Sequence, residues 1–228
     1  MKSLLLFLIF IIFQVTVTAQ DCMSSEYLKK GTKWEVTNLN KKGKATSTAK
    51  YEVLNTNHDS NQKLWEINVV VLDKKNNPVN EGSTEITCEN GIYKMDMSQA
   101  LSAETMQSIQ SMEAEIESSP INYPTNKDVN AVLEDATIII ATSAGMGVMD
   151  LKLSITNRKI QGLETITTEA GTFECLKITE DTKIENKFFN RKYSTVSWFL
   201  PSFGVVKSES YNHKDQLMGG SVLSSLTR

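Results

Sequence analysis

Residues 84–97 read TEITCENGIYKMDM, and this stretch decides the fold. Ile86 and Cys88 share one face of an expected strand, and a second strand is expected over Ile92–Met97. Between them, Asn90-Gly91 is a pair typical of the tight turn that joins two antiparallel strands. The stretch therefore predicts a β-hairpin, the repeating unit of an antiparallel meander.

The same alternation of apolar and polar residues recurs on both sides of this hairpin. Trp34 and Val36 alternate with charged residues, and 64–72 is a strongly β-prone run. Further strands are expected between short turns, at 136–142, 151–155, 159–167, 172–179, 187–200, 204–211 and 216–226. Such strands, without alternating helices, predict a mainly β fold: a curved antiparallel meander sheet, as a half-barrel or an open barrel.

One segment departs from the strand pattern. Ser102 is a suitable N-cap, and Met106, Ile109 and Met112 recur every third residue. One short helix over 102–112, packed against the curved sheet, is therefore expected. Residues 112–117 then alternate apolar side chains with glutamates, which favours a strand with an acidic outer face, while a longer helix is the alternative.

The first 19 residues have the pattern of a signal peptide. Lys2 precedes an apolar stretch that is short for a membrane span, and Val17-Thr18-Ala19 places small residues at the −3 and −1 positions. An uncleaved anchor is the alternative. Residues 20–228 are expected to form a single β-rich domain, with a boundary in 118–127 as the alternative. The mature chain is expected to be exported to the periplasm or outer envelope, or secreted, and not to cross a membrane.

The expected export predicts that cysteines form a disulfide, since cysteines tend to pair in oxidising compartments. Cys22 lies just inside the mature N-terminus, and Cys88 lies on an expected strand. A Cys22–Cys88 bridge would attach a terminus that otherwise frays. Cys175, which shares a strand face with Phe173, is interpreted as a small buried apolar residue rather than a reactive thiol.

Composition and motifs exclude several function classes. The chain has 228 residues, a net charge of −3 and basic residues spread along its length, which disfavours a nucleic-acid binder. Its two histidines, His58 and His213, lie in polar turns, and no nucleophile–base pair is evident. We therefore expect no enzyme activity, no cofactor and no metal site.

Methionine is unusually frequent around the expected helix and the turn at 143–147. Flexible thioethers can form an adaptable apolar surface, although the same residues can equally fill gaps in a core. The side chains that we expect to face an apolar ligand are Met95, Met97, Met106, Ile109, Met112, Met146 and Met149.

Two blocks in the C-terminal half carry a family resemblance. Residues 164–178 read ETITTEAGTFECLKI, and residues 198–209 read WFLPSFGVVKSE. Together they resemble the signature of the TapB family of exported bacterial proteins, also described as domain-of-unknown-function 3108-like. The resemblance implies a curved antiparallel sheet similar to the half-barrels of periplasmic lipoprotein carriers. It implies no catalytic residue.

The sequence thus favours a non-enzymatic envelope protein that holds an apolar or amphipathic ligand, such as a lipid, in its concave sheet. The alternative is a structural or assembly module that binds an envelope protein through an exposed strand edge.

Overall fold

The computed structural model describes residues 22, 26–59, 62–97, 115–125, 128–141, 151–201 and 203–228. These residues form an almost entirely β structure with no α-helix among them. The expected helix at 102–112 lies outside the described residues. Within the described part, no helix has the length and apolarity needed to span a membrane.

All the strands in the described residues belong to one antiparallel sheet of 13 strands. In chain order the strands are β1 (Lys33–Asn40), β2 (Ala45–His58), β3 (Gln62–Asp73), β4 (Pro78–Glu89), β5 (Ile92–Met95), β6 (Glu115–Ser118), β7 (Ile121–Pro124), β8 (Ala136–Ala141), β9 (Leu151–Thr168), β10 (Gly171–Glu185), β11 (Asn190–Leu200), β12 (Gly204–Tyr211) and β13 (Leu217–Thr227). The predicted meander is confirmed, since most neighbours in the sheet are also neighbours in the chain.

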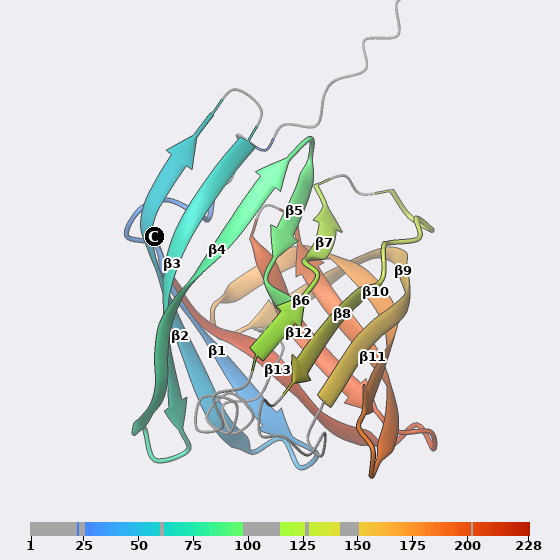
Figure 1. Cartoon of the computed structure of the whole chain (residues 1–228). Coiled ribbons are helices and arrows are strands. Elements are labelled where there is room, and N and C mark those ends of the chain that lie inside the picture. The colour runs from blue at the N-terminus through green and yellow to red at the C-terminus, as the bar shows by residue number, and fades with distance from the viewer. Residues whose placement is uncertain are drawn as a thin grey trace, which may run out of the picture.

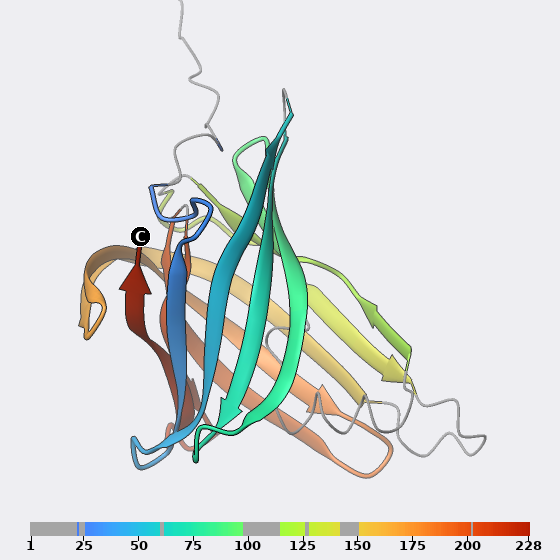
Figure 2. The same cartoon turned by 90° about the vertical axis from the view of Figure 1, so that its left-hand side faces the viewer.

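The sheet curls strongly but remains open (Figures 1 and 2). Its order runs β6-β8-β9-β10-β11-β12-β13-β1-β2-β3-β4-β5-β7. The two edge strands, β6 and β7, follow each other directly in the chain, and only Ser119 and Pro120 separate them. One short chain segment therefore pairs with β8 through its first half and with β5 through its second half.

Large apolar side chains fill much of the concave face. The Trp65 ring stacks on Tyr93 with 5.5 Å between centroids, and its indole Nε1 donates to the carbonyl of Leu28 at 2.8 Å. On the other side of the core, Tyr123 stacks on Phe199 at 4.2 Å. Burial of these aromatic surfaces, with the aliphatic core around them, favours the curled sheet.

Two local features refine the predicted strands. Asn90 and Gly91 both have positive φ, 51° and 76°, as the predicted tight turn requires. The two strands predicted at 151–155 and 159–167 are instead one 18-residue strand, β9. A register irregularity at Asn157, whose φ is 54°, interrupts the alternation without ending the strand.

Gly220 on β13 permits a close approach to β12. A Cβ atom at this position would lie 2.1 Å from the backbone oxygen of Ser208. We expect Gly220→Ala to lower the free energy of unfolding by about 1–3 kcal/mol, because the backbone of two paired strands would have to separate. Chemical denaturation checks this, with Gly82→Ala as the control, since a Cβ at Gly82 meets nothing within 4 Å. Equal midpoints for the two variants would contradict the prediction.

Candidate functional site

The strand register aligns five small polar side chains across five neighbouring strands. Ser197 on β11 pairs with Ser208 on β12, which pairs with Ser221 on β13. Ser221 pairs in turn with Asn38 on β1, which pairs with Ser47 on β2. We call these five residues the hydroxyl row. Residues up to 183 positions apart in the sequence thus form one continuous polar line.

Alternation along each strand places the hydroxyl row on the concave face. Ser197 lies two residues from the buried Phe199, and Ser221 lies two residues from the buried Leu223. Side chains at positions i and i+2 of a strand point to the same face of the sheet. The concave face is therefore divided into a region of large apolar side chains and a level of small polar ones.

Hydrogen bonds along the hydroxyl row leave capacity for a ligand. The hydroxyls of Ser208 and Ser221 are 2.7 Å apart, and Asn38 Nδ2 donates to Ser47 Oγ at 3.0 Å. Each hydroxyl has one donor and two acceptor positions, so these contacts do not exhaust its capacity. The row can therefore hydrogen-bond a polar group without losing its own order.

Aromatic side chains lie close to one end of the hydroxyl row. Trp34 stacks on Tyr51 with 4.9 Å between ring centroids, and these residues lie on the same faces of β1 and β2 as Asn38 and Ser47. Burial raises the pKa of Tyr51 to about 12, because desolvation disfavours the phenolate. On β1 and β2 the concave face thus changes from aromatic to polar over four residues along each strand.

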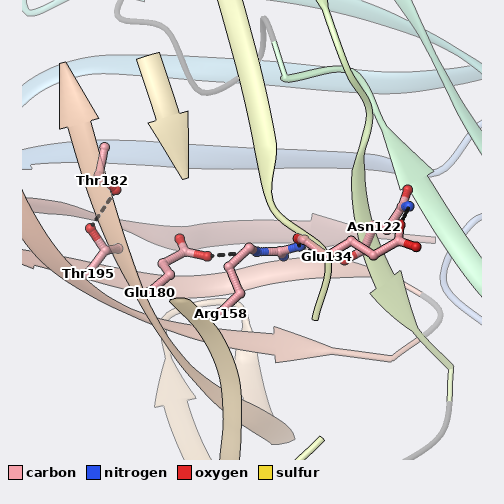
Figure 3. A network of polar contacts seen from close by, with 6 residues as sticks. All are labelled: Asn122, Glu134, Arg158, Glu180, Thr182 and Thr195. Carbon is pink, nitrogen blue, oxygen red and sulfur yellow. Dashed lines mark hydrogen bonds and ion pairs between the residues drawn. The ribbon is translucent and has the colours of Figure 1, made fainter. Parts of the chain in front are cut away.

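A second polar level lies on the neighbouring part of the concave face (Figure 3). Thr195 Oγ1 lies 3.3 Å from Thr182 Oγ1 and 3.1 Å from Ser210 Oγ. Thr195 is also the pairing partner of Glu180. This pairing places the hydroxyls of β10, β11 and β12 beside a buried ion pair.

The ion pair joins Arg158 on β9 to Glu180 on β10, with 3.2 Å between Nε and Oε2. Both side chains are buried, and that of Arg158 is 0% exposed. The irregularity at Asn157 shifts the alternation of β9, so that Arg158 faces the interior together with Ile155 and Ile160. A β-bulge thereby directs a charged side chain into the core.

Arg158 also links the two ends of the open sheet. Its Nη1 donates to the carbonyl of Asn122 on β7 at 3.0 Å and to that of Glu134, just before β8, at 2.8 Å. Figure 3 shows these residues in one line with Glu180. The guanidinium carbon lies 4.9 Å from the centroid of the Tyr123 ring. Arg158 therefore satisfies carbonyls at the place where the strand ladder is interrupted.

Burial raises the pKa of Glu180, and the neighbouring Arg158 opposes this rise. Desolvation therefore disfavours the charged form of Glu180, whereas attraction to Arg158 favours it. We assign it a structural role, since each partner is enclosed and Arg158 already holds two backbone carbonyls.

The structure describes only two of the seven residues predicted to face an apolar ligand. Met97 is fully buried in the core, and Met95 is half-buried, packing against it near Gly204. The other five lie outside the described residues: Met106, Ile109, Met112, Met146 and Met149. The ligand-facing role of the methionines therefore stays a prediction.

The cysteines occupy two different environments. A disulfide joins Cys22 to Cys88, across a sequence separation of 66. Cys175 is a free, buried thiol, and burial raises its pKa to about 12. Since the thiolate is the reactive form, burial and the raised pKa both disfavour a reactive Cys175, as the sequence predicted.

An open groove of about 770 Å³ is lined by residues of β2, β3, β4 and β5 together with Ser118 and Pro120. Its lining includes Met95 and a cross-strand pair of carboxylates, Glu66 and Glu85. Like charges placed directly opposite each other favour a solvated surface. Among the described residues, no three His, Cys, Asp or Glu side chains are grouped to hold a metal ion.

The comparisons with known proteins agree with this architecture. The DUF3108-like family model matches residues 29–223. The chain belongs to the DUF3108-like family. No curated protein matches it.

Two solved structures share the fold of this DUF3108-like protein. One is a Parabacteroides distasonis protein assigned as a lipoprotein, with a TM-score of 0.78 and 26% identity, covering 91% of this chain and 100% of the other. The second is a Bacteroides fragilis protein assigned as exported, with a YmcC-like fold, a TM-score of 0.77 and 22% identity, covering 89% of this chain and 98% of the other. The open antiparallel sheet is thus a fold that these bacterial proteins share.

Proposed function

We propose that this protein is a non-enzymatic, exported envelope protein that binds an amphipathic molecule on the concave face of its sheet. The hydroxyl row carries this proposal. A core built only for stability fills its concave face with large apolar side chains, because close packing gives the most dispersion contact. Five aligned small polar residues, of which Ser47 and Ser197 are buried, instead place hydrogen-bonding capacity at one level of that face.

The distribution of chemistry on the concave face fits an amphiphile. The polar part of the ligand would hydrogen-bond the hydroxyl row, and its apolar part would lie against the region of Trp34 and Tyr51. Binding sites for small molecules are commonly apolar with a few placed polar groups. The Parabacteroides relative, assigned as a lipoprotein, supports an envelope location. The likeness to the TapB family and to lipoprotein carriers remains a prediction.

Docking of a protein partner through a strand edge has less support. The edge strand β6 has only four residues, and two of them, Glu115 and Glu117, are acidic. Short length and charge both oppose the pairing of an edge with another strand. The other edge, β7, faces Arg158, which bonds its Asn122 carbonyl.

Calorimetric titration with lysophosphatidylglycerol, below its critical micelle concentration, tests the proposal. Ser221→Leu adds volume in the middle of the hydroxyl row and removes a hydroxyl, so we expect at least about tenfold weaker binding than for the wild type. Thr48→Leu is the matched control, because Thr48 is adjacent to Ser47 in the sequence but points to the opposite face. An unchanged affinity in Ser221→Leu would contradict the concave site.

A further inference from the structure

One end of the sheet carries most of the unpaired basic residues. Because the strands form an antiparallel meander, the β1–β2, β3–β4, β10–β11 and β12–β13 hairpins all turn at the same end, the lower end in Figures 1 and 2. Their sequences are KKGK at 41–44, DKKNN at 73–77, ENKFFNRK at 185–192 and NHKDQ at 212–216. These segments contain nine Lys and Arg residues and three Asp and Glu residues.

Two of the three acidic residues at this end are already engaged. Asp73 accepts hydrogen bonds from the backbone nitrogens of Lys75 and Asn77 at 2.7 and 2.9 Å, and Glu185 forms an ion pair with Lys183. Among the described residues, no ion pair within 4.0 Å involves any of the nine cations. The hairpin turns at the opposite end, at 59–61, 90–91, 169–170 and 201–203, contain no Lys or Arg, although Lys29 and Lys30 precede β1 there and Lys127 lies between β7 and β8. In a chain of net charge −3, the basic residues of the hairpin turns therefore gather at one end.

Two phenylalanines project from this basic end. Phe188 is 68% exposed and Phe189 is 41% exposed, at the tip of the β10–β11 hairpin. The turn that presents them is closed by Asn186, whose Oδ1 accepts from the backbone nitrogens of both residues at 2.8 and 2.9 Å. Asn186 N also donates to the Phe189 carbonyl at 2.9 Å. The turn thus holds both rings in solvent. Exposing apolar rings to water is unfavourable, and a hairpin tip could carry polar residues instead.

The adjacent hairpin extends the same pattern. The β12–β13 turn contains Lys214, and the first residues of β13, Leu217 and Met218, are 38% and 40% exposed. Apolar tips surrounded by cations match a bilayer surface, because aromatic side chains favour the interface while Lys and Arg are attracted to anionic headgroups. A protein partner would need a complementary shape, whereas a lipid surface needs only this combination of charge and apolar tips.

We propose that this basic end docks on an anionic phospholipid bilayer, with Phe188 and Phe189 inserted among the headgroups. The docking surface is independent of the hydroxyl row, which lies on the concave face. It would hold the protein against a membrane leaflet, with the strand ends of the curled sheet directed to the lipid.

Flotation with vesicles tests the proposal, using phosphatidylcholine alone and phosphatidylcholine mixed with phosphatidylglycerol. We expect binding only to the anionic vesicles, weakened by added salt. Phe188→Ser/Phe189→Ser and Lys187→Gln/Lys192→Gln should each bind at least about tenfold more weakly. Leu163→Ser is the apolar control, since Leu163 on β9 is 45% exposed, and Lys29→Gln/Lys30→Gln is the charge control.

The outcomes separate docking from loss of structure. Thermal unfolding should be unchanged in the double phenylalanine variant, because both side chains are at an exposed tip. Failure of the wild type to float with anionic vesicles would overturn the proposal. Equal binding to both vesicle types, or full binding by the double phenylalanine variant, would overturn it as well.

Discussion

Replacing Arg158 with methionine is expected to lower the free energy of unfolding by about 3–5 kcal/mol, the usual effect of removing one partner of a buried ion pair. The variant leaves Glu180 buried without its countercharge and leaves the carbonyls of Asn122 and Glu134 without their donor. Urea denaturation measures the loss. Arg191→Met is the control, since Arg191 is exposed at the start of β11 and should change stability by less than about 0.5 kcal/mol.

A double variant separates the two contributions of Arg158. Arg158→Met/Glu180→Leu removes both charges, so it should recover most of the electrostatic loss. A deficit of about 1–3 kcal/mol should remain, because the carbonyls at the junction of the sheet ends are still unpaired. Full recovery would show that Arg158 does not hold this junction, contrary to the contacts described above.

The pH dependence of the Arg158→Met variant provides a further check. Burial already raises the pKa of Glu180, and Arg158 lowers it, so loss of Arg158 raises this pKa further. A carboxyl with a raised pKa in the folded state favours folding when protonated, so stability falls as pH rises from its ordinary pKa, about 4.3, through the raised value. The deficit relative to wild type should therefore be larger at neutral than at acidic pH. Parallel pH profiles would contradict the assignment.

Removal of the Cys22–Cys88 disulfide is expected to cost about 4 kcal/mol in the chain-entropy model for a loop of this length. The bridge attaches the segment before β1 to β4, close to Leu28, whose carbonyl accepts from Trp65. Guanidinium denaturation of Cys22→Ser/Cys88→Ala measures the loss. Reduced wild type should then match the variant, and a reductant should not affect the variant further.

The free thiol supplies the control for this experiment. Cys175→Ala should lose only about 1 kcal/mol, because it removes one small buried atom and no cross-link. A wild-type midpoint that is insensitive to reductant would contradict the stabilising role of the disulfide.

Local patterns carried most of the information on the fold. The alternation around Asn90-Gly91 predicted a tight hairpin because the residues that determine a turn are adjacent in the sequence. The predicted interruption between 155 and 159 was wrong, since β9 passes through it. Asn157 is polar and tolerates positive φ, so the sequence around it resembles a turn. The long pairing of β9 with β10 nevertheless continues the strand through this position.

The candidate site could not be predicted in the same way. Single serines at 197, 208, 221 and 47 look like ordinary strand residues, and only the register across five strands shows that they are aligned. Arg158 stands between Asn157 and Lys159, where a charged residue suggests a solvated surface. Its burial depends on a bulge and on carbonyls from distant segments. One signal was present in the sequence. Ser197 and Phe199, like Ser221 and Leu223, are two residues apart, so each serine shares a strand face with a large apolar residue.

Native mass spectrometry of the mature protein, purified from its own envelope, tests the central claim most directly. The account predicts a stoichiometric excess mass that is released on denaturation as an amphiphile, and that is absent from the Ser221→Leu variant but present in Thr48→Leu. A protein mass without any bound molecule, unchanged after envelope lipids are added, would contradict ligand binding on the concave face.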